Sequence, residues 1–111
     1  MKNFKTIEMD MNKMINFFTM NKATNKNIFE YFGVNNVYHI ESHKVKGNTI
    51  SEYDINFGLL TLTITTENDR IADIRGIEVW SDTEIEMSEK ETIKNYFKNE
   101  FNANIIQWIV F

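Results

Sequence analysis

The sequence predicts an α+β fold with two N-terminal helices, an antiparallel meander of about five strands, and a C-terminal helix followed by a buried final strand. Three observations predict this fold. Apolar residues recur at helical spacing before Gly33 and again after Ser88. Between these stretches the apolar pattern alternates with a period of two. Residues 105–111 form an apolar run broken only by Gln107, which is typical of a strand buried on both faces.

Length and composition favour one self-contained domain spanning residues 1–111. A chain of 111 residues has the common size of a single domain, which buries roughly 60–70% of its unfolded surface. The sequence has no cysteine, so its stability must come from packing, without disulfides or thiolate metal sites. It contains neither a ~20-residue apolar run nor an export signal at its start. We therefore expect a soluble, cytoplasmic protein with no membrane partner.

Two short helices are predicted before Gly33, which should stop the second. Asp10 is a plausible N-cap of the first and Thr24 of the second. The apolar positions of the two helices are Met11, Met14, Ile15 and Phe18, and then Ile28, Phe29 and Phe32. An alternative for residues 4–9 is a short edge strand.

The strands follow from the alternation after Val34. Residues 37–46 have few apolar anchors and several Lys, which suits an edge strand leading into a turn at Gly47. Strands at 50–57 and 60–65 come next, with a hairpin turn at residues 67–70. The apolar phase then shifts across Arg75 and Gly76, which predicts a β-bulge.

The C-terminal part should contain the best-defined helix. Ser88 and Glu91 have capping-box spacing, and Ile93, Phe97 and Phe101 recur on one helical face. The run that follows is expected to be a central strand. On that prediction, Trp108 is a core residue whose replacement by Ala would cost ~3–5 kcal/mol.

One cluster has catalytic or metal-binding potential. His39, Glu41 and His43 alternate along the predicted edge strand, so a regular strand would place all three on one face, ~6.6–7 Å apart. Three such side chains suit a zinc site or acid–base chemistry. A solvated strand face is the more common reason for such a pattern, and we predict no catalytic residue, metal site or cofactor.

Charge is distributed unevenly along the chain. Residues 67–91 carry nine acids and three bases, a net charge of −6, whereas residues 1–46 carry seven Lys and four acids, a net charge of +3. An acidic segment is usually a solvated surface, but with an aromatic anchor it also suits recognition of a basic protein. The predicted partner-binding residues are Glu78, Trp80, Asp82, Glu84, Glu86 and Glu89.

The absence of a catalytic motif favours a binding protein over an enzyme. The four glycines stand singly, without a phosphate-binding loop, and the scattered Lys residues do not indicate direct nucleic-acid binding. We expect a small acidic immunity protein or antitoxin, monomeric or weakly dimeric, that blocks a basic toxin such as a nuclease. The alternatives are a phage-type inhibitor of a host nuclease, a small hydrolase using His39, Glu41 and His43, and a structural subunit that pairs through an edge strand.

Overall fold

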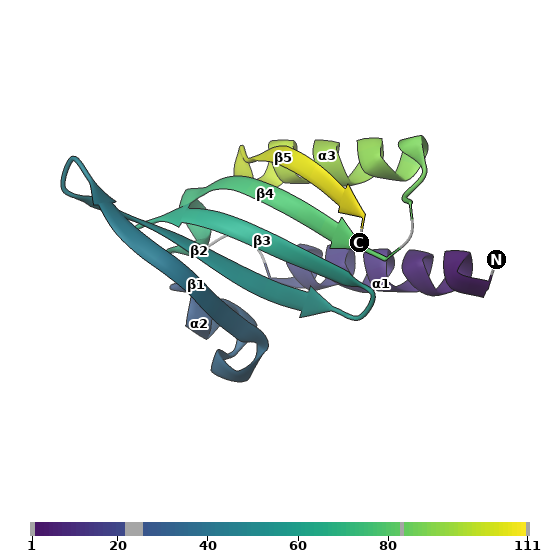
Figure 1. Ribbon diagram of the computed structural model, residues 1–111, viewed down its shortest axis with the longest axis horizontal. Coiled ribbons are helices and arrows are strands. Elements are labelled where there is room, and N and C mark those ends of the chain that lie inside the picture. Colours follow the sequence, from purple (N-terminus) through teal and green to yellow (C-terminus); the bar gives the residue numbers. More distant parts are fainter. Residues whose placement is uncertain (1, 22–25, 83, 111) are drawn as a thin grey trace.

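The computed structural model describes residues 2–21, 26–82 and 84–110, and contains one five-stranded sheet with the order β1-β2-β3-β4-β5 (Figure 1). The strands are Val37–Val45 (β1), Asn48–Phe57 (β2), Leu60–Glu67 (β3), Ile74–Ser81 (β4) and Asn104–Val110 (β5). The first four form an antiparallel meander, and β5 runs parallel to β4. The predicted α+β class and meander are confirmed.

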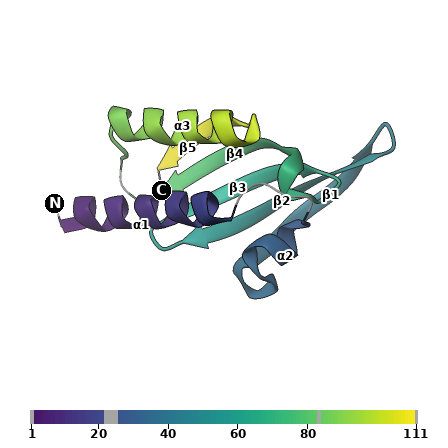
Figure 2. The ribbon, with the colours of Figure 1, turned by 180° about the vertical axis from the view of Figure 1, so that it is seen from behind.

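The helices leave one face of the sheet bare. The described chain has three α-helices, Lys2–Met20 (α1), Ile28–Phe32 (α2) and Met87–Phe101 (α3). Helices α1 and α3 lie on the face turned toward the viewer in Figure 2, whereas the sheet stands in front of them in Figure 1. No described helix covers the opposite face. The side chains of that face can therefore meet a partner.

The core fills the space between the helices and the covered face. Strand alternation directs Tyr53 and Ile55 of β2 into this space, and their cross-strand neighbours Ile64 and Leu62 of β3 join them. Phe18 of α1 is fully buried, with its ring centroid 5.0 Å from Phe97, 5.4 Å from Phe101 and 5.7 Å from Phe32. One ring therefore joins all three helices.

The N-terminal helix is longer than predicted. Helix α1 begins at Lys2, so the edge-strand alternative for residues 4–9 is wrong. Asp10 lies inside the helix and is only 7% exposed, so it is not an N-cap. Its Oδ2 instead accepts a hydrogen bond of 2.7 Å from the Leu59 N–H in the β2–β3 turn. The carboxylate can be buried within the helix because this amide satisfies it.

Local capping also differs from the prediction. Thr24 lies outside the described residues, and α2 is capped by Asn27, which forms a reciprocal capping box with Glu30. Gly33 ends α2 with a φ of +90°, as predicted. Helix α3 begins at Met87 with Glu86 at its N-cap, so the capping box predicted at Ser88 is wrong. Burial of Ile85 fixes the chain just before this point and leaves Ser88 inside the first turn.

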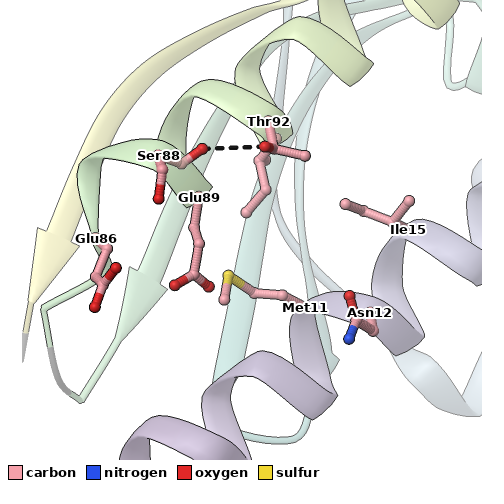
Figure 3. Close-up of a pocket in the computed structure, with 8 residues that line it drawn as sticks. Met11, Asn12, Ile15, Glu86, Ser88, Glu89 and Thr92 are labelled. Carbon is pink, nitrogen blue, oxygen red and sulfur yellow. Dashed lines mark hydrogen bonds between the residues drawn. The ribbon is translucent and has the colours of Figure 1, made fainter.

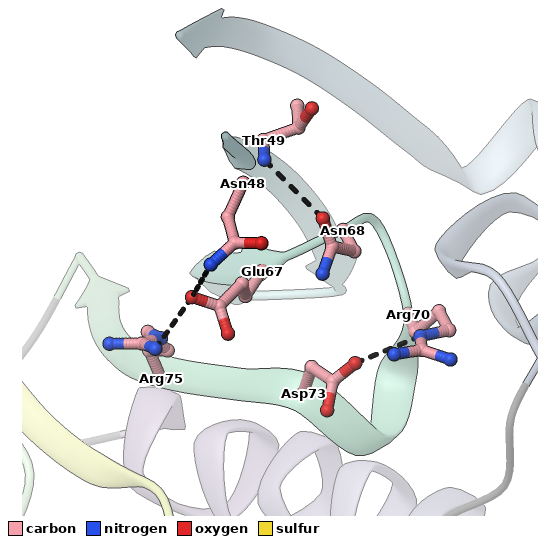
Figure 4. Close-up of polar contacts among 7 residues, drawn as sticks. All are labelled: Asn48, Thr49, Glu67, Asn68, Arg70, Asp73 and Arg75. Atoms are coloured by element: carbon pink, nitrogen blue, oxygen red, sulfur yellow. Dashed lines mark hydrogen bonds and ion pairs between the residues drawn. The ribbon is translucent and has the colours of Figure 1, made fainter. Parts of the chain in front are cut away.

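Two turns and a bulge shape the meander. Lys46 and Gly47, which join β1 to β2, both have positive φ, which is typical of a tight two-residue hairpin turn. Asn68 and Asp69 also have positive φ, but the 3-10 helix Ile71–Asp73 follows them before β4, so this second turn is longer than the hairpin turn predicted at residues 67–70. The second turn is tied to β2 by a hydrogen bond from the Thr49 N–H to Asn68 Oδ1 (Figure 4). In β4, Thr65 pairs with Gly76 and Thr66 with Ile74, so Arg75 is the extra residue of the predicted bulge, which is confirmed.

The final strand is an edge strand, so its predicted central, fully buried position is wrong. Strand β4 pairs with β3 on one side. After the crossover through α3, β5 pairs with the other side of β4 in parallel and is the last strand in the sheet order. Gln107 and Val110 are exposed, and Trp108 is half-buried with Lys90 Nζ 5.7 Å from its ring centroid. Among the described strands, β5 therefore pairs with β4 alone.

Phe18 and Trp108 should differ in their contribution to stability. Phe18→Ala is expected to lower the free energy of unfolding by ~3–5 kcal/mol, because it empties a fully buried site. Trp108→Ala should cost less, roughly 1–2 kcal/mol, because that side chain is only partly buried at the edge of the sheet. Urea unfolding of both variants measures the difference. Equal losses would contradict the edge position of β5.

Gly58 is expected to tolerate a side chain less well than Gly47. A Cβ at Gly58 would lie 2.4 Å from Asp10 Oδ2, whereas a Cβ at Gly47 meets nothing within 4 Å. Both glycines have positive φ, so Gly47→Ala should cost roughly 1–2 kcal/mol through backbone strain alone. Gly58→Ala should cost more in thermal and urea unfolding. Adding Asp10→Ala should recover part of the loss in a double-mutant cycle, and full additivity would contradict the clash.

Candidate partner-binding surface

The bare face of the sheet carries a row of polar side chains that crosses all five strands. Alternation places Glu52, Asp54 and Asn56 of β2 on this face, opposite the buried Tyr53 and Ile55. Directly opposed residues continue the row of Asp54 across the sheet. From β1 to β5 the row consists of Tyr38, Asp54, Thr63, Glu78 and Gln107.

Neighbouring rows add an aromatic side chain and two more carboxylates. On one side, Trp80 of β4 lies between Thr61 of β3 and Ile109 of β5. On the other side, Glu41 of β1 lies directly opposite Glu52 of β2. We call Glu41, Glu52, Asp54, Glu78 and Trp80 the acidic face.

The acidic face holds negative charge that the described part of the chain does not neutralise. Glu41, Glu52, Asp54 and Glu78 form no ion pair with a described Lys or Arg. The two described arginines pair elsewhere, Arg70 with Asp73 at 2.9 Å and Arg75 with Glu67 at 2.6 Å (Figure 4). Glu41 and Glu52 lie directly opposite each other on adjacent strands, and like charges in this position destabilise a sheet. A basic partner would remove this repulsion.

One carboxylate of the acidic face is held in position by the strand beside it. Thr63 Oγ1 donates a hydrogen bond of 2.6 Å to Asp54 Oδ1. Thr63 is itself buried, although it points to the face without a helix. The carboxylate therefore loses little freedom when a partner binds, which reduces the entropic cost of association.

The structure divides the six predicted partner-binding residues between two sides of the molecule. Glu78 and Trp80 are half-buried on the acidic face. Asp82 and Glu84 are exposed between β4 and α3 and belong to no strand, so strand alternation does not place them on a common face. The remaining two, Glu86 and Glu89, lie at the start of α3.

Glu86 and Glu89 line a pocket on the helical side of the molecule. The pocket has a volume of about 420 Å³ and lies between α1 and α3, with the Glu89 carboxylate beside Met11 and Glu86 farther from it (Figure 3). Its other lining residues are Asn12, Ile15, Ser88, Thr92 and Ile93. Since these helices cover the opposite side of the sheet, this pocket and the acidic face are separate features.

A bulge in β1 separates the three residues of the predicted catalytic or metal-binding cluster. His39 pairs with Tyr53 and Glu41 with Glu52, so Ile40 is an extra residue that reverses the alternation. His39 consequently points to the helical side, while Glu41 and His43 point to the bare face. The prediction of a common face is wrong. No group of three His, Asp or Glu side chains in the described chain could hold a metal ion.

His39 instead joins a chain of hydrogen bonds on the helical side. Its Nε2 lies 2.7 Å from Ser42 Oγ, which lies 2.7 Å from Ser51 Oγ of β2. The next residue inward on this face, Tyr53, donates its hydroxyl proton to Asp69 Oδ1 at 2.5 Å. Burial, reinforced by the bond to Asp69, raises the pKa of Tyr53 to about 12.

Sequence reasoning missed the contributions of Glu41, Glu52 and Asp54 to the acidic face. The alternation already indicated that Glu52 and Asp54 share the polar face of their strand. What the sequence lacked was the register that places them beside Glu78 of β4, a residue distant in the chain. Counting charge along the sequence favoured residues 67–91 and overlooked acids brought together by strand pairing.

Comparisons with known proteins do not assign the chain to a family. No protein-family model matches it, and neither the curated proteins nor the solved structures include one with significant similarity. Within the described residues, no helix combines the length and apolar character needed to cross a membrane. Function must therefore be inferred from the geometry and charge of the surfaces themselves.

Tyr53 should make stability depend on pH in the alkaline range. Its pKa is raised from 10 to about 12 in the folded state, so its contribution to stability is complete below pH 10. As pH rises from 10 toward 12, the unfolded state releases the proton first and stability falls. Tyr53→Phe should show a shallower decline in the free energy of unfolding over this range. Parallel curves for the two proteins would contradict the raised pKa.

Proposed function

We propose that this chain is a protein-binding, neutralising protein of the immunity-protein or antitoxin class, which blocks a toxin by binding it. The observation that carries the proposal is the acidic face. It is a sheet surface without a described helix over it, and its carboxylates have no cationic partner in the described chain. Complementary charge accelerates and orients the association of two proteins.

The charge of the acidic face indicates the chemistry of the partner. Enzymes that cut nucleic acids present Lys and Arg to the phosphate backbone, so their substrate channels are positively charged. A rigid sheet that presents Glu52, Asp54 and Glu78 can occupy such a channel and exclude the substrate. We therefore infer that the partner is a basic toxin, with a nuclease as the best match, and that neutralisation takes place in the cytoplasm of the producing cell.

Trp80 would supply specificity that charge alone does not provide. It lies in the row beside Glu78 and is half-buried, so its ring is already largely ordered. Tryptophan is enriched among the residues that dominate binding energy, especially at the centre of an interface surrounded by polar groups. In the proposed complex, Trp80 is the apolar anchor and the surrounding carboxylates guide the approach.

Co-expression provides the direct test of this proposal. The candidate partners are the proteins encoded by the reading frames beside the gene, each expressed with and without this chain. A partner should be toxic alone, harmless together with this chain, and recoverable as a stable complex. If none of these proteins is toxic and none forms a complex, the proposed function is contradicted.

Charge reversal should locate the interface. Glu52→Lys/Glu78→Lys is expected to slow association by roughly tenfold or more and to weaken its salt dependence, because long-range attraction is lost. Glu84→Lys/Glu86→Lys makes the same charge change outside the acidic face. A second control, Glu91→Lys/Glu100→Lys, lies on exposed positions of α3. Stopped-flow association rates distinguish these variants, and equal slowing by all three pairs would show that only net charge matters.

A further inference from the structure

Strand β1 offers a long sheet edge that no described strand covers. It is the first strand in the sheet order, so the outward N–H and C=O groups of its backbone have no strand partner in the described chain. The β1–β2 hairpin projects beyond the other strands (Figure 1). Tyr38, Ile40 and Val45 are 71%, 43% and 44% exposed, which places apolar surface along this edge. Such an edge readily pairs with another strand.

We propose that β1 pairs in antiparallel fashion with β1 of a second copy, about a two-fold axis at Ser42, to form a continuous ten-stranded sheet. This pairing does not depend on the proposed function, because it uses the strand edge and takes only Glu41 from the acidic face, leaving Glu52, Asp54, Glu78 and Trp80 free. A two-fold axis requires each contact to occur twice, so the sequence of β1 must be complementary to its own reverse.

The charges of β1 select Ser42 as the centre. With Ser42 opposite itself, Glu41 lies opposite His43 of the second copy, and the same contact occurs a second time by symmetry. Both residues point to the bare face, because they pair with Glu52 and Ile50 in the regular part of β1. An imidazole N–H can donate a hydrogen bond to the opposing carboxylate.

Other registers bring incompatible groups together. Centring on Glu41 opposes two carboxylates, which destabilises a strand pair. Centring on Ile40 would oppose His39 to Glu41, but the bulge directs these residues to opposite faces. In the Ser42 register, Lys44 lies opposite Ile40 of the second copy, so the Lys side chains of the edge do not repel each other.

The register gives a two-fold dimer with a defined arrangement of faces. Because Glu41 and His43 both point to the bare face, the acidic faces of the two copies would lie on the same side of the joined sheet. The helices of both copies would lie on the other side. The dimer would thus present one broad acidic surface.

Single cysteines test the register directly, since the natural sequence has none. Residues directly opposite each other in an antiparallel pair have Cα atoms about 4.5–5.5 Å apart, which suits a disulfide. Ser42→Cys should therefore form a covalent dimer under mild oxidation. Lys44→Cys, on the same strand, should not, because its two copies would be about 13 Å apart. Non-reducing electrophoresis measures the dimer, and equal cross-linking of both variants would overturn the register.

A charge exchange provides the second test. Glu41→Lys should weaken dimerisation in sedimentation equilibrium by roughly two- to thirtyfold, because two symmetry-related contacts are lost at once. Adding His43→Glu should restore dimerisation, since the introduced lysine would then lie opposite the introduced glutamate of the second copy. Glu91→Lys, an exposed change of equal charge on α3, should leave the dissociation constant unchanged. Circular dichroism confirms that each variant is folded.

Two outcomes would overturn the proposal. One is a natural protein that stays monomeric at every concentration tested. The other is a Glu41→Lys/His43→Glu variant that dimerises no better than Glu41→Lys alone. Neither outcome bears on toxin neutralisation, which is measured with the partner present.

Discussion

The fold depends on packing the aromatic side chains of three helices against one face of a single sheet. Phe18 is the centre of this contact, since its ring touches Phe32 of α2 and both Phe97 and Phe101 of α3. Without disulfides, this layer has to hold the helices in place through burial alone. A two-layer arrangement buries one side of the sheet and leaves the other to water or to a partner.

That asymmetry explains why the functional candidates lie where they do. The described helices take up the apolar side chains of the sheet, so the opposite face can carry charge without loss of core packing. Strand pairing then gathers acids that are scattered in sequence, as Glu41 and Glu52 show. The repulsion between these carboxylates lowers the stability of the free protein. A basic protein that covered them would relieve the repulsion, which would add to the free energy of binding.

The features set by the local sequence pattern were predicted correctly. Those set by the pairing of segments far apart in the chain were not. Alternation of Leu62 and Ile64 identified the meander, and the phase shift at Arg75 identified its bulge. The bulge at Ile40 was missed because β1 has too few apolar residues to reveal a change of phase. The terminal run containing Trp108 looked central because apolar content reports burial but not position in the sheet. Of the site, Glu78 and Trp80 were predicted, whereas Asp54 required the register.

The contact between Asp10 and Leu59 has a consequence for folding during synthesis. It joins residues 49 positions apart. Helix α1 also contacts β2, β3 and α3. During translation, α1 therefore emerges well before the surfaces that cover it, at a rate of only about 5–20 residues per second. Its exposed Met and Phe side chains would be a natural substrate for chaperones during that interval, and folding can be completed only after α3 has left the ribosome.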